Sequence, residues 1–199
     1  LGMFQYGGGG YHCIWMEDRD FEIFRDRKLT AVTNPSSNLK LASGICPLKR
    51  FYDNGINLAI GTDGPASNNC LDMFREMFLT TGLSKVCEMD AAGIPADAIL
   101  YMATAGGAHA MQLTDCDRLA AGKKADLVMI DLHQPNMQPE NNLLKNLVYS
   151  GSKQNVKLTM VNGQILYENG EFHIGFDPEE IYARSNVIIQ RISGSHADN

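Results

Sequence analysis

Residues 57–69 read Asn-Leu-Ala-Ile-Gly-Thr-Asp-Gly-Pro-Ala-Ser-Asn-Asn, an apolar run that passes directly into a loop of small and polar residues. The apolar part, residues 57–62, predicts a buried strand, with Asp63 and Gly64 at its carboxyl end. In a parallel β/α barrel the carboxyl ends of the strands form the active face, so a carboxylate there is a candidate metal ligand or base. The alternative interpretation, equally supported by this segment, is that Asp63 only caps the following turn or helix. This segment alone does not decide between the two interpretations.

The residues around this stretch alternate between short apolar runs and amphipathic segments, which is typical of β-α-β units with a parallel sheet. Further strands are predicted at residues 11–16 and 29–33, and helices at residues 17–27, 47–54 and 96–111, with another helical stripe through Leu71, Phe74 and Phe78. The fold class predicted for this part of the chain is therefore α/β.

The pattern changes after Gly122, where short strands follow one another without helices between them. Strands are predicted at residues 125–132, 156–161 and 164–167, and residues 134–146 are predicted to be a loop. Asn162-Gly163 is a strong hairpin signal. A capping box at Asp177 and Glu180, with Pro178 between them, predicts the start of a last helix, which is followed by a tail.

Composition and charge exclude several classes of function. The 199 residues are 44% hydrophobic, which is ordinary for a globular protein. The net charge is −6 and the basic residues are scattered, so nucleic acid and membrane surfaces are not expected as partners. No apolar stretch approaches the ~18 residues of a membrane span. Five cysteines without a C-x-x-C pair predict neither a disulfide framework nor a thiolate metal site, and we expect a cytoplasmic protein.

A second candidate residue is His12, at the end of the first predicted strand and preceded by glycines. A lone histidine at a strand end is more often a hydrogen-bonded structural residue than a ligand. The polar segment at residues 34–41 also follows a strand, but such clusters usually form turns that satisfy their own backbone. Cys13 and Cys70 are interpreted as small apolar filler. No chemistry is expected of the other histidines, which are His109, His133, His173 and His196.

Taken together and in this order, the segments around His12, at residues 34–44 and at residues 61–69 resemble the amidohydrolase superfamily. Residues 122–131 and 161–170 are similar to the closing segments of that family, which build a small β-sandwich. The pairing of Asn-Leu-Lys-Leu-Ala-Ser-Gly with Thr-Asp-Gly-Pro-Ala-Ser-Asn-Asn is most similar to the 5-methylthioadenosine/S-adenosylhomocysteine deaminases within that superfamily. The resemblance covers nearly the whole chain.

The resemblance implies the C-terminal part of a TIM-like (β/α)8 barrel at residues 1–121, sandwich strands at 122–174, and a helix and tail at 175–199. A whole barrel takes ~250 residues, so about three of its eight strands are expected here. The chain begins with Leu1 rather than methionine, which also suggests a piece of a longer protein. Self-association, or pairing with the missing N-terminal half, is therefore expected.

The resemblance also implies a zinc site and a reaction. Relatives hold zinc with an H-x-H motif, a further histidine and the aspartate that matches Asp63, which is the only one of the four ligands found here. The implied reaction is deamination of the adenine ring of a small nucleoside by metal-bound hydroxide. Asp63 would bind the metal and take the water's proton, and would contact the substrate. His12 would hydrogen-bond the attacking oxygen, and Ser67 would bind the substrate.

Two alternatives stay open at this stage. One is another amidohydrolase activity on the same scaffold, such as that of a guanine deaminase or a chlorohydrolase, because pocket contacts from the missing half decide the substrate. The other is a non-catalytic module. The resemblance also implies a glutamate, three residues after the fifth-strand histidine, that shuttles protons. Because the H-x-H motif and this histidine and glutamate are missing, the isolated chain is expected to be inactive and to retain no zinc.

Overall fold

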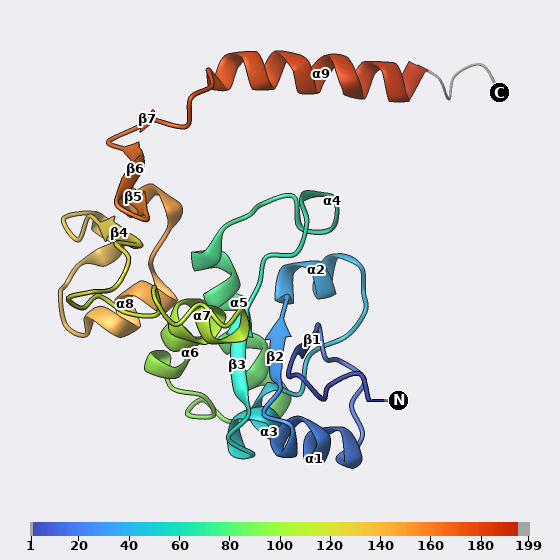
Figure 1. The fold of residues 1–199 in the computed structure, drawn as a ribbon. Coiled ribbons are helices and arrows are strands. Elements are labelled where there is room, and N and C mark those ends of the chain that lie inside the picture. Colours follow the sequence, from blue (N-terminus) through green and yellow to red (C-terminus); the bar gives the residue numbers. More distant parts are fainter. Residues whose placement is uncertain (1, 195–199) are drawn as a thin grey trace. The chain divides into compact units, whose positions relative to one another are not determined.

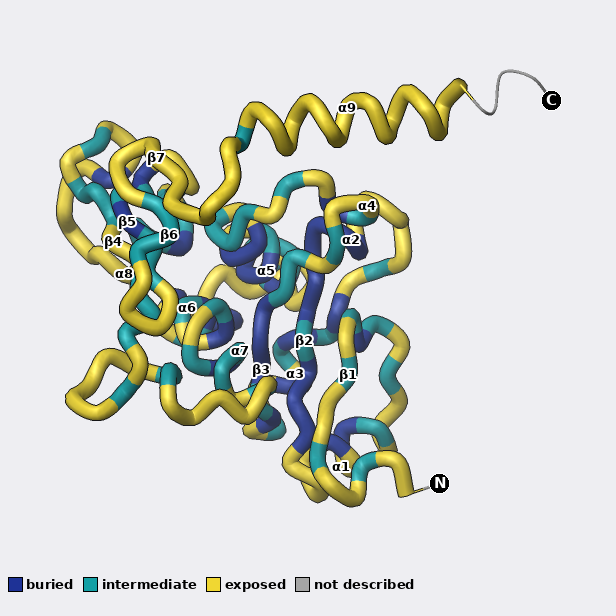
Figure 2. The backbone as a smooth tube through the Cα atoms, turned by 45° about the horizontal axis from the view of Figure 1, so that its top comes forward, coloured by how far each residue is buried: buried dark blue, intermediate teal, exposed yellow. Residues whose placement is uncertain are grey.

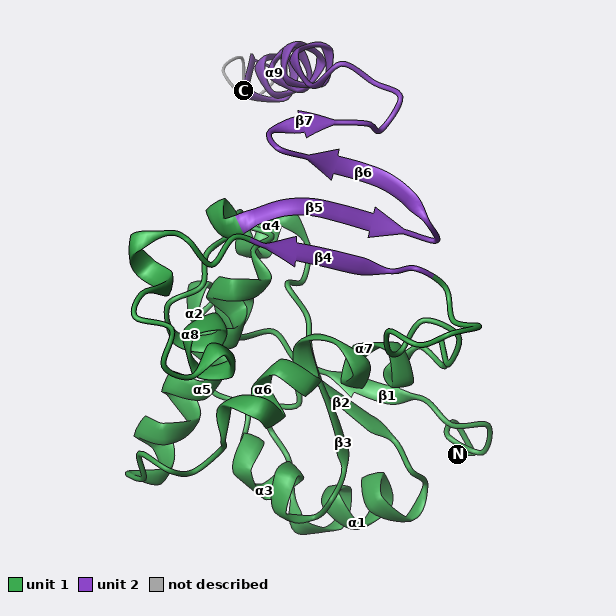
Figure 3. Cartoon of the chain, turned by 90° about the vertical axis from the view of Figure 1, so that its left-hand side faces the viewer, with its two compact units in different colours: residues 1–124, 131–155 green, residues 125–130, 156–199 purple. Residues whose placement is uncertain are grey.

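The computed structural model of the chain describes residues 2–194, so the predicted tail at 195–199, which includes His196, lies outside the described residues. The chain forms two compact units (Figure 3). The first comprises Leu1–Lys124 and Asp131–Asn155, and the second comprises Ala125–Ile130 and Val156–Asn199. The domain boundaries inferred above, at 121/122 and 174/175, stay a prediction.

The first unit is built on a parallel sheet in the order β1-β2-β3 (Figure 1). The strands are β1 (Gly9–Tyr11), β2 (Thr30–Thr33) and β3 (Asn57–Ile60), and both pairings are parallel. β2 is the central strand, and most of β2 and β3 is buried (Figure 2). The helices of this unit are α1 (Asp18–Asp26), α2 (Pro35–Lys40), α3 (Leu48–Asp53), α4 (Pro65–Asn68), α5 (Met73–Glu88), α6 (Ala96–Ala103), α7 (Ala105–Ala110) and α8 (Leu143–Tyr149), with 3-10 turns η1 (Pro135–Met137) and η2 (Lys153–Asn155).

The core of this unit joins the helices to the central strands. Phe51 of α3 is fully buried, and its ring lies 4.6 Å from Phe21 and 5.6 Å from Phe24, both of α1, between ring centroids. Ala31 of β2 and Leu58 of β3 belong to the same buried cluster. Phe21 and Phe24 thus lie on the buried face of α1, and they pack in one cluster with residues of the sheet.

The first strand differs from its prediction, which placed it at residues 11–16. β1 ends at Tyr11 because His12 and Cys13 adopt positive φ angles of 65° and 46°, which a strand does not accommodate. It begins two residues earlier, at Gly9, where a side chain would meet the carbonyl oxygen of Thr30 at 2.2 Å. The glycine therefore lets β1 approach β2 closely.

Two further segments differ from their predictions. The single helix predicted at residues 96–111 is two helices, α6 and α7, because the backbone of Thr104 leaves the helical region at φ −129° and ψ −99°. The loop predicted at residues 134–146 contains η1 and the start of α8. Asn142 begins α8 by accepting the amide hydrogen of Lys145, and Met137 of η1 is fully buried, so packing orders this polar segment.

The second unit is an antiparallel sheet in the order β4-β5-β6-β7 followed by a helix. Its strands are β4 (Leu127–Ile130), β5 (Val156–Val161), β6 (Gln164–Glu168) and β7 (Glu171–Phe172). The hairpin predicted at Asn162-Gly163 is confirmed, with positive φ at both residues as a two-residue hairpin turn requires. Asp177 accepts the amide hydrogen of Glu179 at the start of α9 (Pro178–Gly194). Within residues 2–194, no helix is long and apolar enough to cross a membrane.

Removing the Phe51 ring tests this account of the core. Phe51→Ala should lower the free energy of unfolding by about 3–5 kcal/mol, since it deletes a buried aromatic side chain and leaves a cavity. Urea denaturation followed by circular dichroism measures the change. Tyr52→Ala is the matched control on the same helix, because Tyr52 is 40% exposed and should cost much less. Equal losses for the two variants would contradict the packing described here.

Candidate functional site

The candidate site lies at the carboxyl edge of the parallel sheet, where three connections leave neighbouring strands. His12 follows β1, α2 follows β2, and Asp63 follows β3. Parallel strands bring their carboxyl ends to one edge, so residues far apart in sequence meet there. The Nε2 atom of His12 lies 3.9 Å from Oδ2 of Asp63. The structure therefore brings the two principal sequence-predicted residues together.

Asp63 is held by two serine hydroxyls that both donate to its Oδ2 atom. Ser37 of α2 donates at 2.7 Å and Ser67 of α4 at 2.8 Å. These hydrogen bonds, Ser37 first and Ser67 second, lower the pKa of the Asp63 carboxyl from 3.8 to about 2, with smaller help from the Gly64 backbone and His12. Hydrogen bonds of this kind favour the charged form. Asp63 is thus ionised at neutral pH, as a metal ligand or a proton acceptor must be.

His12 is oriented by Asn38, whose Oδ1 atom lies 2.7 Å from Nδ1 of the ring. An amide oxygen only accepts, so Nδ1 carries the hydrogen and Nε2 faces Asp63. Nε2 then accepts a hydrogen bond when the ring is neutral and donates one when the ring is protonated. The hydrogen bond from Nδ1 to Asn38 thus fixes which nitrogen of His12 points into the site.

Both sequence-predicted residues lie on left-handed backbone. The φ angle is 65° at His12 and 59° at Asp63, values that residues other than glycine adopt only uncommonly. Non-glycine residues of this kind cluster at ligand sites, because the surrounding contacts fix an unfavourable backbone in place. The structure also places Gly61 where a side chain would meet Oδ1 of Asn34 at 2.4 Å. The glycine thus lets the segment after β3 approach the segment after β2 closely.

The sequence of the chain matches a known family. The profile of the amidohydrolase family matches residues 7–166. The chain belongs to the amidohydrolase family.

Its similarity to individual proteins is equally extensive. A 5-methylthioadenosine/S-adenosylhomocysteine deaminase of Caldanaerobacter subterraneus subsp. tengcongensis is 40% identical over 183 residues, which are 92% of this chain and 42% of that protein. A 5'-deoxyadenosine deaminase of Methanosarcina acetivorans is 42% identical over 181 residues, 91% of this chain and 41% of that protein. The crystal structure of a zinc-bound adenosine deaminase from Xanthomonas campestris is 35% identical, with a TM-score of 0.89, over 94% of this chain and 42% of that one.

The coverage values show how much of its relatives the chain corresponds to. The chain spans less than half the length of the relatives it matches. Its three-stranded parallel sheet with the associated helices is part of the family's TIM-like barrel, in agreement with the predicted fold class. The carboxyl edge of the sheet, where Asp63 lies, is the side on which such barrels carry their active sites.

The donors at this edge fit part of a zinc site. A carboxylate and an imidazole are both zinc ligands by chemical type, and a structural or catalytic site needs at least three protein ligands. Within residues 2–194, no three His, Cys, Asp or Glu side chains are grouped to hold a metal ion. Asp63 and His12 thus offer two donors of the right chemical type, where a zinc site needs at least three.

Ser37 and Asn38 are the residues that the sequence analysis missed. They belong to the polar segment at residues 34–41, which was interpreted as a self-satisfied turn, but the segment is a helix and both side chains contact the predicted site residues. Lys40 of the same helix donates to the carbonyl oxygen of Ala66 and to Asn69. The signal was present in the position of this segment directly after a strand that is parallel to β3.

Of the two cysteines interpreted as apolar filler, Cys13 is buried, whereas Cys70 is only partly buried. Cys13 and Cys46 are buried, and desolvation raises the pKa of their thiols to about 11 and about 12, respectively. Thiols of that kind stay protonated at neutral pH and are poor nucleophiles. Cysteine chemistry at these two positions is therefore excluded as the basis of the site.

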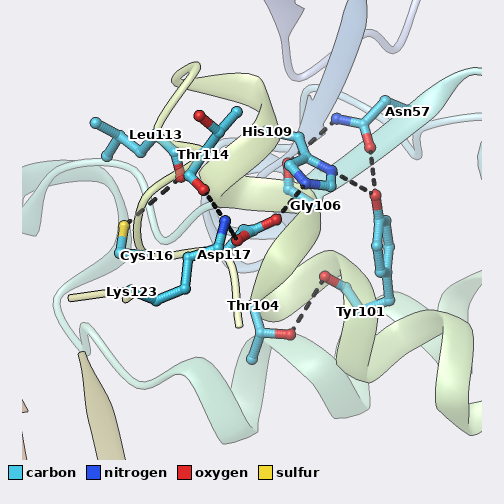
Figure 4. A network of polar contacts seen from close by, with 10 residues as sticks. All are labelled: Asn57, Tyr101, Thr104, Gly106, His109, Leu113, Thr114, Cys116, Asp117 and Lys123. Atoms are coloured by element: carbon cyan, nitrogen blue, oxygen red, sulfur yellow. Dashed lines mark hydrogen bonds and ion pairs between the residues drawn. The ribbon is translucent and has the colours of Figure 1, made fainter. Parts of the chain in front are cut away.

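His109 belongs to a second polar network, at the amino ends of the strands (Figure 4). Tyr101 contacts Nδ1 of His109 at 2.9 Å and Oδ1 of Asn57 at 3.2 Å, and Nε2 of His109 lies 3.2 Å from Asp117. Lys123 pairs with Asp117 and, together with His109, lowers the pKa of that carboxyl to about 2. A cavity of about 520 Å³ adjoins this network. The amino-terminal end of a barrel typically serves stability rather than catalysis, so this network is interpreted as structural.

The hydroxyl of Ser37 provides a test of the electrostatics at Asp63. In the metal-free chain, Ser37→Ala should raise the pKa of the Asp63 carboxyl from about 2 toward 3.8, because it removes the largest interaction that favours the charged form. Carboxyl carbon chemical shifts measured against pH by NMR give this value.

Ser36→Ala is the matched control for that titration. The hydroxyl of Ser36 is buried and has no hydrogen-bond partner among the described residues. The control should therefore leave the Asp63 pKa unchanged. If both variants shifted the pKa of Asp63 equally, the Ser37 hydroxyl would not be the cause of the lowered pKa.

Proposed function

We propose that this chain is the C-terminal part of a zinc-dependent aminohydrolase that removes the amino group from the adenine ring of 5-methylthioadenosine or S-adenosylhomocysteine. The observation that carries the proposal is the ionised Asp63 carboxylate, held by Ser37 and Ser67 with His12 3.9 Å away. Relatives at about 40% identity that are named as deaminases of these nucleosides support the substrate class. The 5'-deoxyadenosine deaminase relative supports the same reaction at the adenine ring.

The residues of this chain would have different roles in the reaction. Zinc, when bound, acidifies a water molecule and so supplies the nucleophile at neutral pH. Asp63 would bind the metal and accept the proton of the attacking water. His12 would hold a hydrogen bond to the attacking oxygen through Nε2, and the Asn38 contact favours this orientation. Ser67 would contact the substrate in addition to Asp63, since its hydroxyl lies at the same edge.

The missing ligands would come from the N-terminal half of the barrel. The outer sides of β1 and β3 are the edges of the described sheet, and unpaired strand edges seek partners. We propose that these edges pair with the N-terminal half or, without it, with another copy of the chain. The substrate would be a small cytoplasmic nucleoside, with no role for nucleic acid or membrane.

Asp63→Asn tests the catalytic role in the protein expressed from its complete reading frame. Asparagine tolerates the φ of 59° found at this position and its amide oxygen can still bind a metal, but it cannot accept the water's proton. The variant should keep part of its zinc and lose kcat by about 100- to 10,000-fold with methylthioadenosine. Zinc content and ammonia release measure the two effects.

Ser67→Ala is the comparison for that variant. It removes the hydroxyl that donates to the ionised Asp63 carboxylate and should reduce kcat/KM by about tenfold, because a hydrogen bond to a charged group contributes about 1.5 kcal/mol or somewhat more. Near-parental kcat in Asp63→Asn would demote Asp63 to a turn residue, and the active-site assignment would then be wrong.

A separate prediction concerns the 199-residue chain alone. It should release no ammonia from adenosine substrates and hold no stoichiometric tight zinc, since one carboxylate and one histidine do not complete a four-coordinate site. Metal analysis after dialysis against a weak chelator checks the zinc content. One tightly held zinc per chain, with deaminase activity, would contradict the proposed division of the site between the two halves.

A further inference from the structure

Glu76 is a fully buried carboxylate in the first turn of α5. Both of its oxygens accept hydrogen bonds from segments that carry site residues. Oε2 accepts the backbone amide hydrogen of Ser36 at 3.0 Å, and Oε1 accepts from Nδ2 of Asn68 at 2.8 Å. A carboxylate is costly to bury unless its oxygens are satisfied, so these two contacts fix where both donors lie.

The contact with Ser36 begins helix α2. Ser36 is the second residue of α2, and its amide is one of those at a helix start that have no partner within the helix. The residue before the helix, Asn34, makes no capping hydrogen bond with its side chain. Glu76 therefore caps α2 from another helix, and its negative charge suits that helix start. The next two residues of α2, Ser37 and Asn38, are the partners of Asp63 and His12.

The contact with Asn68 fixes the other side of the site. Asn68 is the last residue of α4 and uses the same Nδ2 atom to donate to the carbonyl oxygen of Thr62 at 2.6 Å. Thr62 directly precedes Asp63, and Ser67, the neighbour of Asn68, donates to the Asp63 carboxylate. Glu76 thus acts through Asn68 on the backbone and the side-chain contact of Asp63 at once.

We propose that Glu76 is a positioning residue for the reaction, which holds α2 and α4 in register so that Asp63, His12 and their partners meet at the sheet edge. The proposal rests on the proposed function above. Glu76 is buried, so it acts through Ser36 and Asn68 rather than by touching the substrate. The left-handed backbone of Asp63 needs such external support, because the residue does not favour that conformation by itself.

Glu76→Gln removes one of the two acceptors while keeping the size of the side chain. The glutamine amide has one oxygen, so either Ser36 or Asn68 faces its NH2 group and loses its partner. In the protein expressed from its complete reading frame, zinc affinity and kcat should each fall about 10- to 100-fold, as for residues that orient metal ligands. In the metal-free protein, hydrogen exchange should accelerate at least about tenfold at whichever donor loses its acceptor, the backbone amide of Ser36 or the side-chain amide of Asn68.

Met77→Ala is the matched control for general destabilisation. Met77 neighbours Glu76 on α5 and is buried in the core, but it is not part of the polar contacts around the site. The control should lower the Tm at least as much as Glu76→Gln, and should keep parental zinc affinity and kcat when assayed well below its Tm. The readouts are zinc titration, ammonia release, calorimetry and amide exchange.

The outcomes separate this inference from the proposed function. Parental zinc affinity, kcat and Ser36 exchange in Glu76→Gln would overturn the positioning role, as would equal losses in Met77→Ala. If the unmutated protein neither bound zinc nor released ammonia, the proposed function would fail. Amide exchange would then still decide whether Glu76 holds the two helices. Faster exchange at Ser36 or at the Asn68 side chain in Glu76→Gln, and not in Met77→Ala, would support it, and unchanged exchange at both donors would refute it.

Discussion

The carboxylate of Asp63 joins three pieces of chain that leave three different strands. Its Oδ2 atom accepts hydroxyl hydrogens from Ser37 and Ser67 and faces the ring of His12. The site exists only while these segments keep their relative positions, and the parallel sheet supplies the first condition by ending its strands at one edge. The hydrogen bonds supply the second, since each is short and directed and thus sensitive to small shifts of either helix.

Much of this arrangement follows from local sequence. Buried parallel strands are short apolar runs, and polar residues directly after them mark the edge of the sheet, so the strand before Asp63 and the place of Asp63 itself were predictable. The hairpin at Asn162-Gly163 was equally predictable, because two adjacent positive φ angles require residues of that type. In both cases the residues of one short segment determine its backbone conformation, without contacts from distant residues.

Other features depend on contacts between distant residues and were not predictable. The first strand ends at Tyr11 because His12 turns left-handed to place its ring beside Asn38, 26 residues away. The segment at 34–41 is rich in residues that favour turns, and it becomes a helix because the carboxylate of Glu76 satisfies its first free amide. Local propensity is a weak guide wherever a buried group from another element completes the hydrogen bonds of the backbone.

Asp63 and Glu76 carry the same chemical group, but the difference in their burial gives them different roles. Asp63 is about one-third exposed in its side chain and is thus open to a metal ion, water or substrate. Glu76 is fully buried and both its oxygens face donors from the protein, so it has nothing left to offer a ligand. A sequence displays both as acidic residues near one another. Only the depth of each group, which the packing of α5 against the site loops decides, makes one a candidate for the reaction and the other a support for it.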